Sequence, residues 1–293
     1  MLGIDVGGTN IRAGLFDPKD NSLHCVRSTR TEASEGARHA LTRVAELARE
    51  VVEQGREVGL VAGRVGIGVP ELVGPDGQIE TRCSLDWHAR QVRASLSTHG
   101  KVTIASDVLA ASLAEARLGA GRGHRVFLYV TVGTGISYSL VIDGKPFTGA
   151  HGHAISFASG PTASAIGAQS KAALEPLEAR ASGPGILRRA RAAGLMQPDS
   201  IAVCRTALKG PGIAREIVDA AATELAVHVA ILVNALDPTL VVLGGGLGCA
   251  RGRYWSTFRG ALPQYIWGPN MSLLRVRRAQ LGSRAGIIGA AQW

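Results

Sequence analysis

The chain opens with two short apolar runs that flank a polar turn. Leu2–Val6 and Ile11–Phe16 are rich in aliphatic residues, and their length predicts two strands. Residues 7–10 between them read Gly-Gly-Thr-Asn. A further run, Leu23–Thr29, predicts a third strand. The N-terminal region is therefore expected to form a strand, a glycine-rich turn and two more strands.

A helix with one buried face is predicted next. Over Ser34–Gln54 the apolar residues recur every three or four positions, and Arg and Glu fill the opposite face. Arg64–Ile67 predicts a short strand, which we expect to break at Gly66, Gly68 and Pro70. Glycine and proline at this spacing favour a turn that exposes backbone amides.

The same pattern returns further along the chain. Val102–Ala105 predicts a strand and Val108–Leu118 a helix. Arg125–Val132 and Ser137–Ile142 predict two more strands. The turn between these two strands consists of Gly133, Thr134 and Gly135. Because both halves contain a strand, a Gly/Thr turn and a strand, we expect two similar α/β lobes that face a shared cleft, where ligands usually bind.

The C-terminal part ends in small residues. Arg215–Leu236 predicts a long buried helix, and Leu240–Leu243 predicts a strand. Three glycines follow this strand: Gly244, Gly245 and Gly246. They allow a flat ligand to lie on the backbone, although a flexible loop has the same composition. Gly286–Ala291 predicts a last, small-residue helix.

Composition narrows the class of protein. The chain has 293 residues, of which 46% are hydrophobic, enough for one large core or two moderate ones. It contains no apolar run of about 18 residues and no signal-peptide pattern, so we expect no membrane partner. Its four cysteines are scattered without a CxxC pair, which favours free thiols and a cytoplasmic location.

The chain is basic, with a net charge of +9 and a pI of about 9.9. Basic charge can serve nucleic acid or an anionic substrate. The arginines are spread along the chain and aromatic residues make up only 4%, so no basic block with interleaved aromatics exists. We therefore expect no nucleic-acid partner. Biased genome composition also explains an excess of Arg, Ala and Gly.

The first turn carries candidate chemistry. Gly7 and Gly8 allow positive φ and a close approach of backbone N–H groups to an anion. Thr9 and Asn10 add side-chain donors, and Asp5 at the strand end could hold a hydrated Mg²⁺ beside phosphates. A hairpin with a Gly-Gly turn is the alternative, and the turn alone does not decide between them.

Taken together, these turns resemble the ROK family of bacterial sugar kinases, within the actin-like ATPase superfamily. The matching segments are 3–10 (Gly-Ile-Asp-Val-Gly-Gly-Thr-Asn), 66–70 (Gly-Ile-Gly-Val-Pro), Asp107, 133–136, 143–144, 149–152 (Gly-Ala-His-Gly), 181–184, 237–238, 243–246 and 286–290. The resemblance covers essentially the whole chain. It implies an α/β fold with two actin-like ATPase (ribonuclease H-like) lobes and a cleft between them. The smaller lobe would comprise residues 1–107 plus about 282–293, and the larger lobe residues 108–281.

The resemblance also implies a mechanism that uses ATP and Mg²⁺. Asp5, Gly7, Gly8, Thr9 and Asn10 look like the first phosphate motif, with Asp5 reaching Mg²⁺ through water or phosphate. Gly133, Thr134 and Gly135 look like the second. Gly244, Gly245 and Gly246 look like the turn near the adenosine and α-phosphate.

Asp107 matches the catalytic base of the family, which accepts the proton of a sugar hydroxyl. Ser106 or Asp107 could instead cap the following helix, and the two roles are compatible.

Departures from the family pattern concern the acceptor and zinc. Ser106 stands where the family usually has Asn, and Ser156 and Ser159 replace a sugar-binding Glu and a His that binds sugar and zinc. The zinc Cys run is missing too, and Ser164–Leu177 contains no Cys. We therefore expect no zinc.

Several residues are assigned to the acceptor side by the resemblance. Glu178 matches a second sugar-contacting Glu, with a solvated helix acid as the alternative. His151 could touch substrate or form a structural hydrogen bond in its turn. The expected substrate residues are Gly68, Pro70, Ser106, Asp107, His151, Ser156, Ser159 and Glu178.

The expected enzyme phosphorylates the primary hydroxyl of a modified hexose-like ring, an aminohexose such as kanosamine or a C7-cyclitol. An unpaired buried group costs about 1–3 kcal/mol, so plain glucose would lose contacts at the serines. Antibiotic biosynthesis fits such a substrate, and the family implies a homodimer. The alternatives are an ordinary glucokinase that uses ATP or polyphosphate, and a non-catalytic sugar sensor. A sensor is disfavoured because Asp107 is retained and the phosphate motif starts at residue 3.

Overall fold

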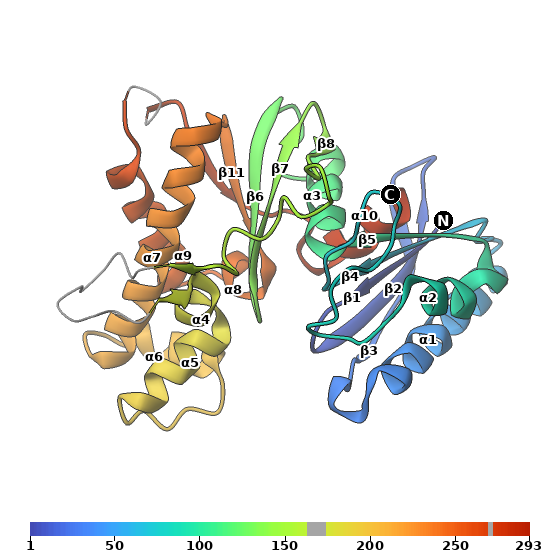
Figure 1. Cartoon of the computed structure of the whole chain (residues 1–293), viewed down its shortest axis with the longest axis horizontal. Helices are drawn as coiled ribbons and strands as arrows, with labels where there is room; N and C mark the ends of the chain where they lie inside the picture. The colour runs from blue at the N-terminus through green and yellow to red at the C-terminus, as the bar shows by residue number, and fades with distance from the viewer. Residues whose placement is uncertain (163–173, 269–271) are drawn as a thin grey trace. The chain divides into compact units, whose positions relative to one another are not determined.

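The computed structural model describes residues 1–162, 174–268 and 272–293 (Figure 1). By contacts between residues the chain divides into two compact units. The first unit contains residues 1–123, 144–155 and 283–293, and the second contains residues 124–143 and 156–282. Residues 108–123 thus group with the first unit. The expected lobe boundary after residue 107 stays a prediction, because the lobes were defined by family resemblance and not by contacts.

The first unit is built on a five-stranded mixed sheet in the order β3-β2-β1-β4-β5. Its strands are β1 (Leu2–Val6), β2 (Asn10–Asp17), β3 (Ser22–Arg30), β4 (Arg64–Val69) and β5 (Lys101–Ser106). β1 pairs antiparallel with β2 and parallel with β4, and β4 pairs parallel with β5. The carboxyl ends of β1, β4 and β5 therefore meet at one edge of the sheet.

Alternation along these strands separates two faces. Leu2 and Ile4 belong to an apolar cluster with residues of α1 (Ala37–Glu57) and α2 (Ala89–Leu96). Gly3 and Asp5 point to the opposite face, because successive side chains of a strand alternate. That face is covered by α10 (Ala285–Gln292), which packs against α3 (Asp107–Leu118). Short 3₁₀ turns, η1 (Ala33–Glu35) and η2 (Ser97–His99), complete this unit.

Glycines allow α10 to approach the sheet closely. A Cβ atom added at Gly3 would lie 2.0 Å from the carbonyl oxygen of Ile287, and one at Gly66 would lie 1.7 Å from that of Ala290. Gly289 of α10 meets α3 in the same way, since its Cβ would lie 1.7 Å from the carbonyl oxygen of Ala110. Backbone contact at these positions leaves no room for a side chain.

The second unit repeats the strand order of the first. Its strands run in the order β12-β11-β6-β7, with β6 (Val126–Val132), β7 (Ile136–Ile142), β11 (Leu240–Gly244) and β12 (Arg275–Arg278). The two-residue strand β8 (Lys145–Pro146) lies in residues 144–155, which group with the first unit. β6 pairs antiparallel with β7 and parallel with β11, as β1 does with β2 and β4. The internal repeat expected from the sequence is therefore present in the topology.

Helices bury one apolar face of this second sheet. The central one is α7 (Ile213–Leu236), whose buried residues form one cluster with residues of β6 and β11. The other elements are α4 (Leu177–Ala181), α5 (Gly183–Ala192), α6 (Ser200–Ala207), α8 (Gly245–Cys249), α9 (Arg253–Ala261), η3 (Leu262–Tyr265), η5 (Gly282–Arg284) and the short pair β9 (Pro161–Thr162) and β10 (Glu175–Pro176). None of the helices in the described ranges is long and apolar enough to cross a membrane.

Two expectations about glycine were wrong. Gly66 and Gly68 do not form a turn, because β4 continues through both of them to Val69. Gly66 packs closely against Ala290, whereas a Cβ at Gly68 would meet the Cα atom of Asp107 at 3.4 Å, an ordinary van der Waals distance. Gly7 and Gly8 are absent from the residues with positive φ, so the first turn does not need glycine for its backbone angles.

The packing predicts that Gly66→Ala is strongly destabilising. The new methyl group would have to displace the C-terminal turn of α10, and overpacking of this kind costs about 1–3 kcal/mol or more. Gly63→Ala is the matched control, since nothing lies within 4 Å of a Cβ at Gly63. Urea unfolding should show a loss for the first variant alone, and equal stability of both would contradict the close approach.

Candidate active site

Asp5 lies at the carboxyl end of β1 on the face covered by α10. Its register partner on β2 is Arg12, whose guanidinium lies 3.6 Å from the carboxylate. The Asp5 side chain is 17% exposed. Burial raises the pKa of Asp5 to about 6, and the charge and hydrogen bond of Arg12 partly oppose this rise. Asp5 is thus a carboxylate whose charge is poorly compensated.

The first turn of α10 lies directly over Asp5. A Cβ atom at Gly286 would lie 2.4 Å from Cγ of Asp5, so the carboxylate occupies the space where a side chain would stand. Asp5 therefore approaches the backbone near the helix start, where the helix dipole favours negative charge. Gly286, expected from the sequence only as part of the last helix, thus makes room for this carboxylate.

The first turn is closed by hydrogen bonds of its own backbone. The amide of Gly7 donates to the carbonyl oxygen of Asn10 at 2.9 Å. Thr31 is fully buried, its hydroxyl donates to the Gly7 oxygen at 2.6 Å, and its amide donates to the Thr9 oxygen at 2.9 Å. Gly8 and Thr9 are exposed. Thr31 supports the turn from outside the motif, so sequence spacing gave no sign of it.

Asp107 begins α3, directly after β5. Burial, together with the negative charges of Asp5 and Glu71, raises its pKa to about 7. The amide of Val108, which donates to its Oδ1 at 2.6 Å, opposes this rise. Gly68 on β4 is the register partner of Asp5, and a Cβ there would lie 3.4 Å from Cα of Asp107. Adjacent parallel strands thus bring Asp5, Gly68 and Asp107 together.

Ser106 is held by a neighbour rather than by the helix. It occupies the N-cap position of α3, but its side chain makes no capping hydrogen bond. Its Oγ instead donates to the main-chain oxygen of Glu71 at 2.7 Å, and the residue is 1% exposed. The alternative interpretation of Ser106 as a side-chain cap is therefore wrong. A role toward the acceptor stays a prediction.

Glu71 follows Pro70 and was not singled out from the sequence. It is 5% exposed and its carboxylate accepts hydrogen bonds from the chain segment 81–85. A lone Glu after a proline is typical of a solvated loop, so only the surrounding amides mark it as special.

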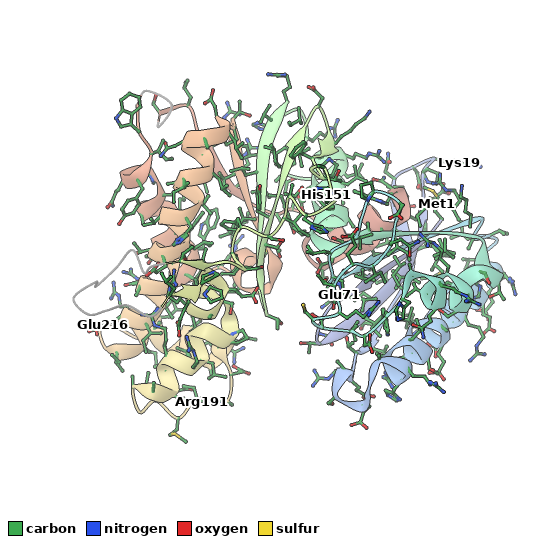
Figure 2. All side chains as sticks on the ribbon, viewed as in Figure 1. Met1, Lys19, Glu71, His151, Arg191 and Glu216 are labelled. Atoms are coloured by element: carbon green, nitrogen blue, oxygen red, sulfur yellow. The ribbon has the colours of Figure 1, made fainter. Side chains whose placement is uncertain are left out.

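His151 lies in the same unit but is not tied to the carboxylates. It is exposed, and its ring centroid lies 6.3 Å from that of His153. His153 in turn pairs with Glu80 at 2.7 Å. Figure 2 marks His151 and Glu71 among the side chains. The expected substrate contact of His151 stays a prediction.

The second unit contains the other predicted turn and Glu178. The Gly133 amide donates to the Gly135 oxygen at 2.9 Å, and the Gly133 oxygen accepts from Gly183 at 2.9 Å. Oε2 of Glu178 accepts from the amide of Ile136, which begins β7, at 2.8 Å. Glu178 is partly buried, so the alternative of a fully solvated helix acid does not hold. Its carboxylate steadies the turn at residues 133–135.

The three glycines at and after the end of β11 have different surroundings. A Cβ at Gly244 would lie 2.3 Å from the hydroxyl of Tyr129, and one at Gly245 would lie 2.4 Å from the carbonyl oxygen of Val132. Gly245 also has a φ of 78°. Gly246 has open space, and its amide lies 3.7 Å from where a Cβ of Gly133 would stand. The two glycine turns therefore lie side by side within this unit.

Two other residues predicted for the acceptor side lie at the surface. Ser156 and Ser159 are exposed, and the Ser159 amide donates to the Ser156 oxygen at 3.2 Å. Of the zinc-related segment Ser164–Leu177, residues 164–173 lie outside the described residues. Elsewhere in the chain, over the described ranges, no group of three or more His, Cys, Asp or Glu side chains could hold a metal. The expectation of no zinc stays a prediction.

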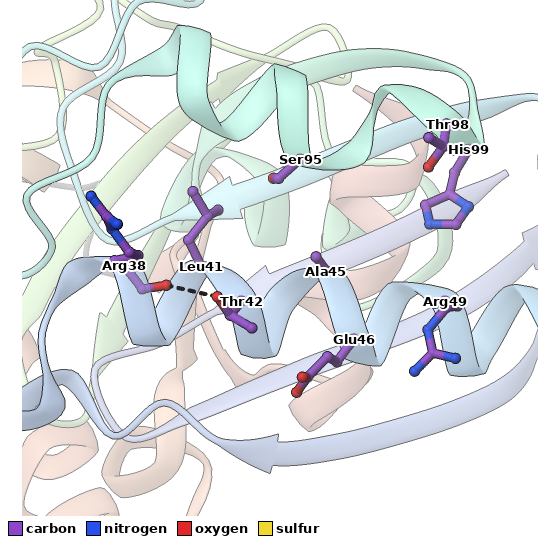
Figure 3. Close-up of a pocket in the computed structure, with 9 residues that line it drawn as sticks. All are labelled: Arg38, Leu41, Thr42, Ala45, Glu46, Arg49, Ser95, Thr98 and His99. Atoms are coloured by element: carbon purple, nitrogen blue, oxygen red, sulfur yellow. Dashed lines mark hydrogen bonds between the residues drawn. The ribbon is translucent and has the colours of Figure 1, made fainter.

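A surface groove of about 420 Å³ lies elsewhere on the first unit, between α1 and the α2–η2 segment (Figure 3). Its lining residues are Arg38, Leu41, Thr42, Ala45, Glu46, Arg49, Ser95, Thr98 and His99. None of these residues was predicted to act on substrate. The groove is separate from the edge of the sheet that carries Asp5 and Asp107.

Comparison with known proteins gives one family over the whole chain. The model of the ROK family matches residues 1–293. The chain is 32% identical over 294 residues to the bifunctional enzyme NanE/NanK of Brucella melitensis, covering 99% of this chain and 53% of that protein. It thus spans about half the length of this relative.

Other relatives match along nearly their full length. The chain is 30% identical to the glucokinase of Thermotoga maritima over 317 residues, covering 99% of this chain and 96% of that one. It is 29% identical to the kanosamine kinase of Amycolatopsis mediterranei over 300 residues, covering 99% and 94%.

Solved structures share the fold. A ROK hexokinase from Thermus thermophilus has a TM-score of 0.79 at 31% identity, covering 99% of this chain and 96% of that one. A glucokinase from Streptomyces griseus, in complex with glucose and AMPPNP, has a TM-score of 0.84 at 23% identity, covering 100% and 98%. The actin-like α/β fold expected from the sequence is confirmed.

The raised pKa of Asp107 predicts a pH-dependent gain of stability in Asp107→Asn. An aspartate in the unfolded chain ionises near pH 4, whereas Asp107 in the folded chain ionises near pH 7. The wild type therefore loses stability as pH rises between these values, and the whole penalty is present above pH 7. The variant should gain about 1–3 kcal/mol at pH 8 and nothing near pH 4.

Urea unfolding at several pH values measures this gain. Asp86→Asn is the control, because its carboxylate is 76% exposed and ion-paired with Arg82 at the surface. A gain for Asp107→Asn of equal size at pH 4 and pH 8 would contradict the assigned shift.

Proposed function

The chain belongs to the ROK family, and from this premise we propose that it is an ATP-dependent kinase of the primary hydroxyl of a hexose-like ring. The observation that carries the proposal is Asp107, a partly buried carboxylate whose pKa is raised to about 7 at the strand edge that also holds Asp5. Relatives of the chain include a glucokinase and a kanosamine kinase, which supports a phosphotransferase acting on a sugar hydroxyl.

Asp107 is proposed as the general base. A base is most effective when its pKa lies near the working pH, and burial together with Asp5 gives Asp107 such a value. In the reaction the acceptor oxygen forms a bond to the γ-phosphorus of ATP, the bond to the ADP oxygen breaks, and the hydroxyl proton passes to Asp107. The chemistry otherwise needs positioning and charge neutralisation.

Asp5 is proposed as the anchor of Mg²⁺, reached through water or phosphate. The Asp5 carboxylate fits this role, because a hard cation prefers carboxylate oxygen. A cation would also compensate the buried charge that Arg12, 3.6 Å away, balances only in part. When bound, Mg²⁺ would neutralise charge on the phosphates. The turn of Gly7, Gly8, Thr9 and Asn10 presents exposed residues beside this carboxylate.

The second unit is proposed to hold the rest of the nucleotide. The turn at residues 133–135 is steadied by Glu178, and Gly246 beside it has open space. Both are neutral glycine-rich backbones of the kind that lie against phosphate. The complex of the Streptomyces griseus glucokinase with AMPPNP supports ATP as the nucleotide.

The acceptor is proposed to be a modified ring, an aminohexose of the kanosamine type or a C7-cyclitol. Ser106, Ser156 and Ser159 are shorter than the groups of the family pattern, so they cannot pair every hydroxyl of glucose. The similarity to a kanosamine kinase supports this class and a place in antibiotic biosynthesis. Gly68, Pro70, His151 and Glu178 remain proposed acceptor-side residues.

Ordinary glucokinase activity is the second candidate, and the Thermotoga maritima relative favours it. A sugar sensor without catalysis is the third, and the raised pKa of Asp107 argues against it. A homodimer and a cytoplasmic location are proposed from the family alone.

A screen of acceptors tests the proposal. We expect Mg²⁺-dependent ADP release with kanosamine or a C7-cyclitol at least tenfold faster than with glucose. Asp107→Asn should lower kcat by about 10²–10⁴-fold and leave the KM for ATP nearly unchanged. Glu115→Gln is the control, because Glu115 lies buried on the same helix and accepts the amide of Ala120 at its far end.

The outcomes separate the candidates. Glucose as the best acceptor would favour the ordinary glucokinase. Retention of the wild-type rate in Asp107→Asn would remove the proposed base, and absence of activity with every acceptor would favour the sensor.

Gly246→Val tests the nucleotide turn and the donor. A side chain fits at Gly246 without a clash, so folding should be preserved while the space for adenosine is filled. We expect the KM for ATP to rise at least tenfold, with no effect of Gly260→Val, a second glycine with open space in the same unit. Activity with polyphosphate that Gly246→Val leaves unchanged would instead identify polyphosphate as the donor.

A further inference from the structure

We propose that Glu71 is a positioning residue for Asp107. It fixes the end of β5, directly before the base, relative to the chain segment 81–85. The inference rests on the proposed function, in which Asp107 is the base. It adds a residue that no sequence motif of the chain contains.

The Glu71 carboxylate is surrounded by donors. Its Oε1 accepts the amides of Ser84 and Leu85 at 2.6 and 2.9 Å. Its Oε2 accepts the amide of Cys83 at 3.0 Å and the hydroxyl of Thr81 at 2.6 Å. An ionised carboxylate only accepts, and it offers about four lone-pair positions. A glutamine could not replace it, because its NH₂ group would face backbone N–H donors.

The main chain of Glu71 contacts the residue directly before the base. Its carbonyl oxygen accepts the hydroxyl of Ser106, the residue directly before Asp107, at 2.7 Å. Ser106 and Glu71 are both buried. One residue thus joins three parts of the chain that are far apart in sequence: the end of β4, the segment 81–85 and the start of α3.

The charge of Glu71 also acts on Asp107. It is one of two carboxylates, with Asp5, whose negative charge disfavours ionisation of Asp107, while the amide of Val108 opposes them. Glu115 is a second buried acid on the same helix. Its carboxylate accepts the amide of Ala120 at the end of α3, away from Asp107. Glu71 differs because its main chain contacts Ser106, the residue before the base, and because its charge acts on Asp107.

Glu71→Gln in the full chain tests the proposal. Hydrogen exchange at the amides of residues 83–85 should accelerate, and kcat should fall at least tenfold while the KM for Mg·ATP changes less than twofold. The titration midpoint of Asp107, followed by carboxyl ¹³C NMR of the unliganded protein, should fall by about half a pH unit or more. Glu115→Gln should change none of the three.

These measurements distinguish a positioning role of Glu71 from a purely structural one. Faster amide exchange in Glu71→Gln with kcat and the Asp107 midpoint unchanged would overturn the proposal, because Glu71 would then be only structural. If the wild type phosphorylates no acceptor, the proposed function fails, yet the Asp107 midpoint and the exchange rates still decide the role of Glu71.

Ser106→Ala tests the same proposal if Glu71→Gln does not fold. It removes the hydroxyl that links Asp107 to the Glu71 main chain and leaves the carboxylate and its four donors in place. Because Ser106 is also an expected acceptor-side residue, the KM for the acceptor is measured as well. We expect kcat to fall about three- to tenfold, the loss of one hydrogen bond, with a change of less than twofold in that KM and normal exchange at residues 83–85. An unchanged kcat would overturn the proposal.

Discussion

Close packing of α10 on β1 and β4 is the constraint on which the candidate site depends. Backbone meets backbone at Gly3 and Gly66, so the helix cannot move toward or away from the sheet without losing these contacts. The same packing puts Gly286 over Asp5. The depth at which Asp5 is buried, and hence its raised pKa, follows from a helix position that the glycines fix.

Acids then accumulate at one edge of the sheet. Asp5, Glu71 and Asp107 come together because β1 and β4 are parallel neighbours and β5 leads into α3. The Arg12 guanidinium at 3.6 Å from Asp5 offsets part of this charge. Such an arrangement costs stability, and perturbed carboxylates of this kind are typical of functional sites. Anything that neutralises Asp5 also favours ionisation of Asp107, so the two proposed roles are electrostatically linked.

Much of the fold could be predicted because it depends on local periodicity. The strand Leu2–Val6 and the repeat of strand, turn and strand can be predicted from the pattern of apolar and polar residues. Glycine was harder, since the sequence does not distinguish a glycine that needs positive φ from one that admits a neighbouring backbone, as at Gly66. Glu71 was missed because three of its four partners are backbone amides 12 to 14 residues away, and every residue type except proline can supply such an amide.

The two units share a topology but differ in charge at the equivalent position. Asp5 pairs in register with Gly68, and its counterpart Thr131, two residues before the second turn, pairs with Gly244. The first unit thus places an acid where the second places a hydroxyl. An acid beside a phosphate requires a cation or a proton between them, whereas a neutral turn binds the anion directly. In the proposed function, this difference would assign the cation and the proton to the acid of the first unit and the anion to the neutral turn of the second.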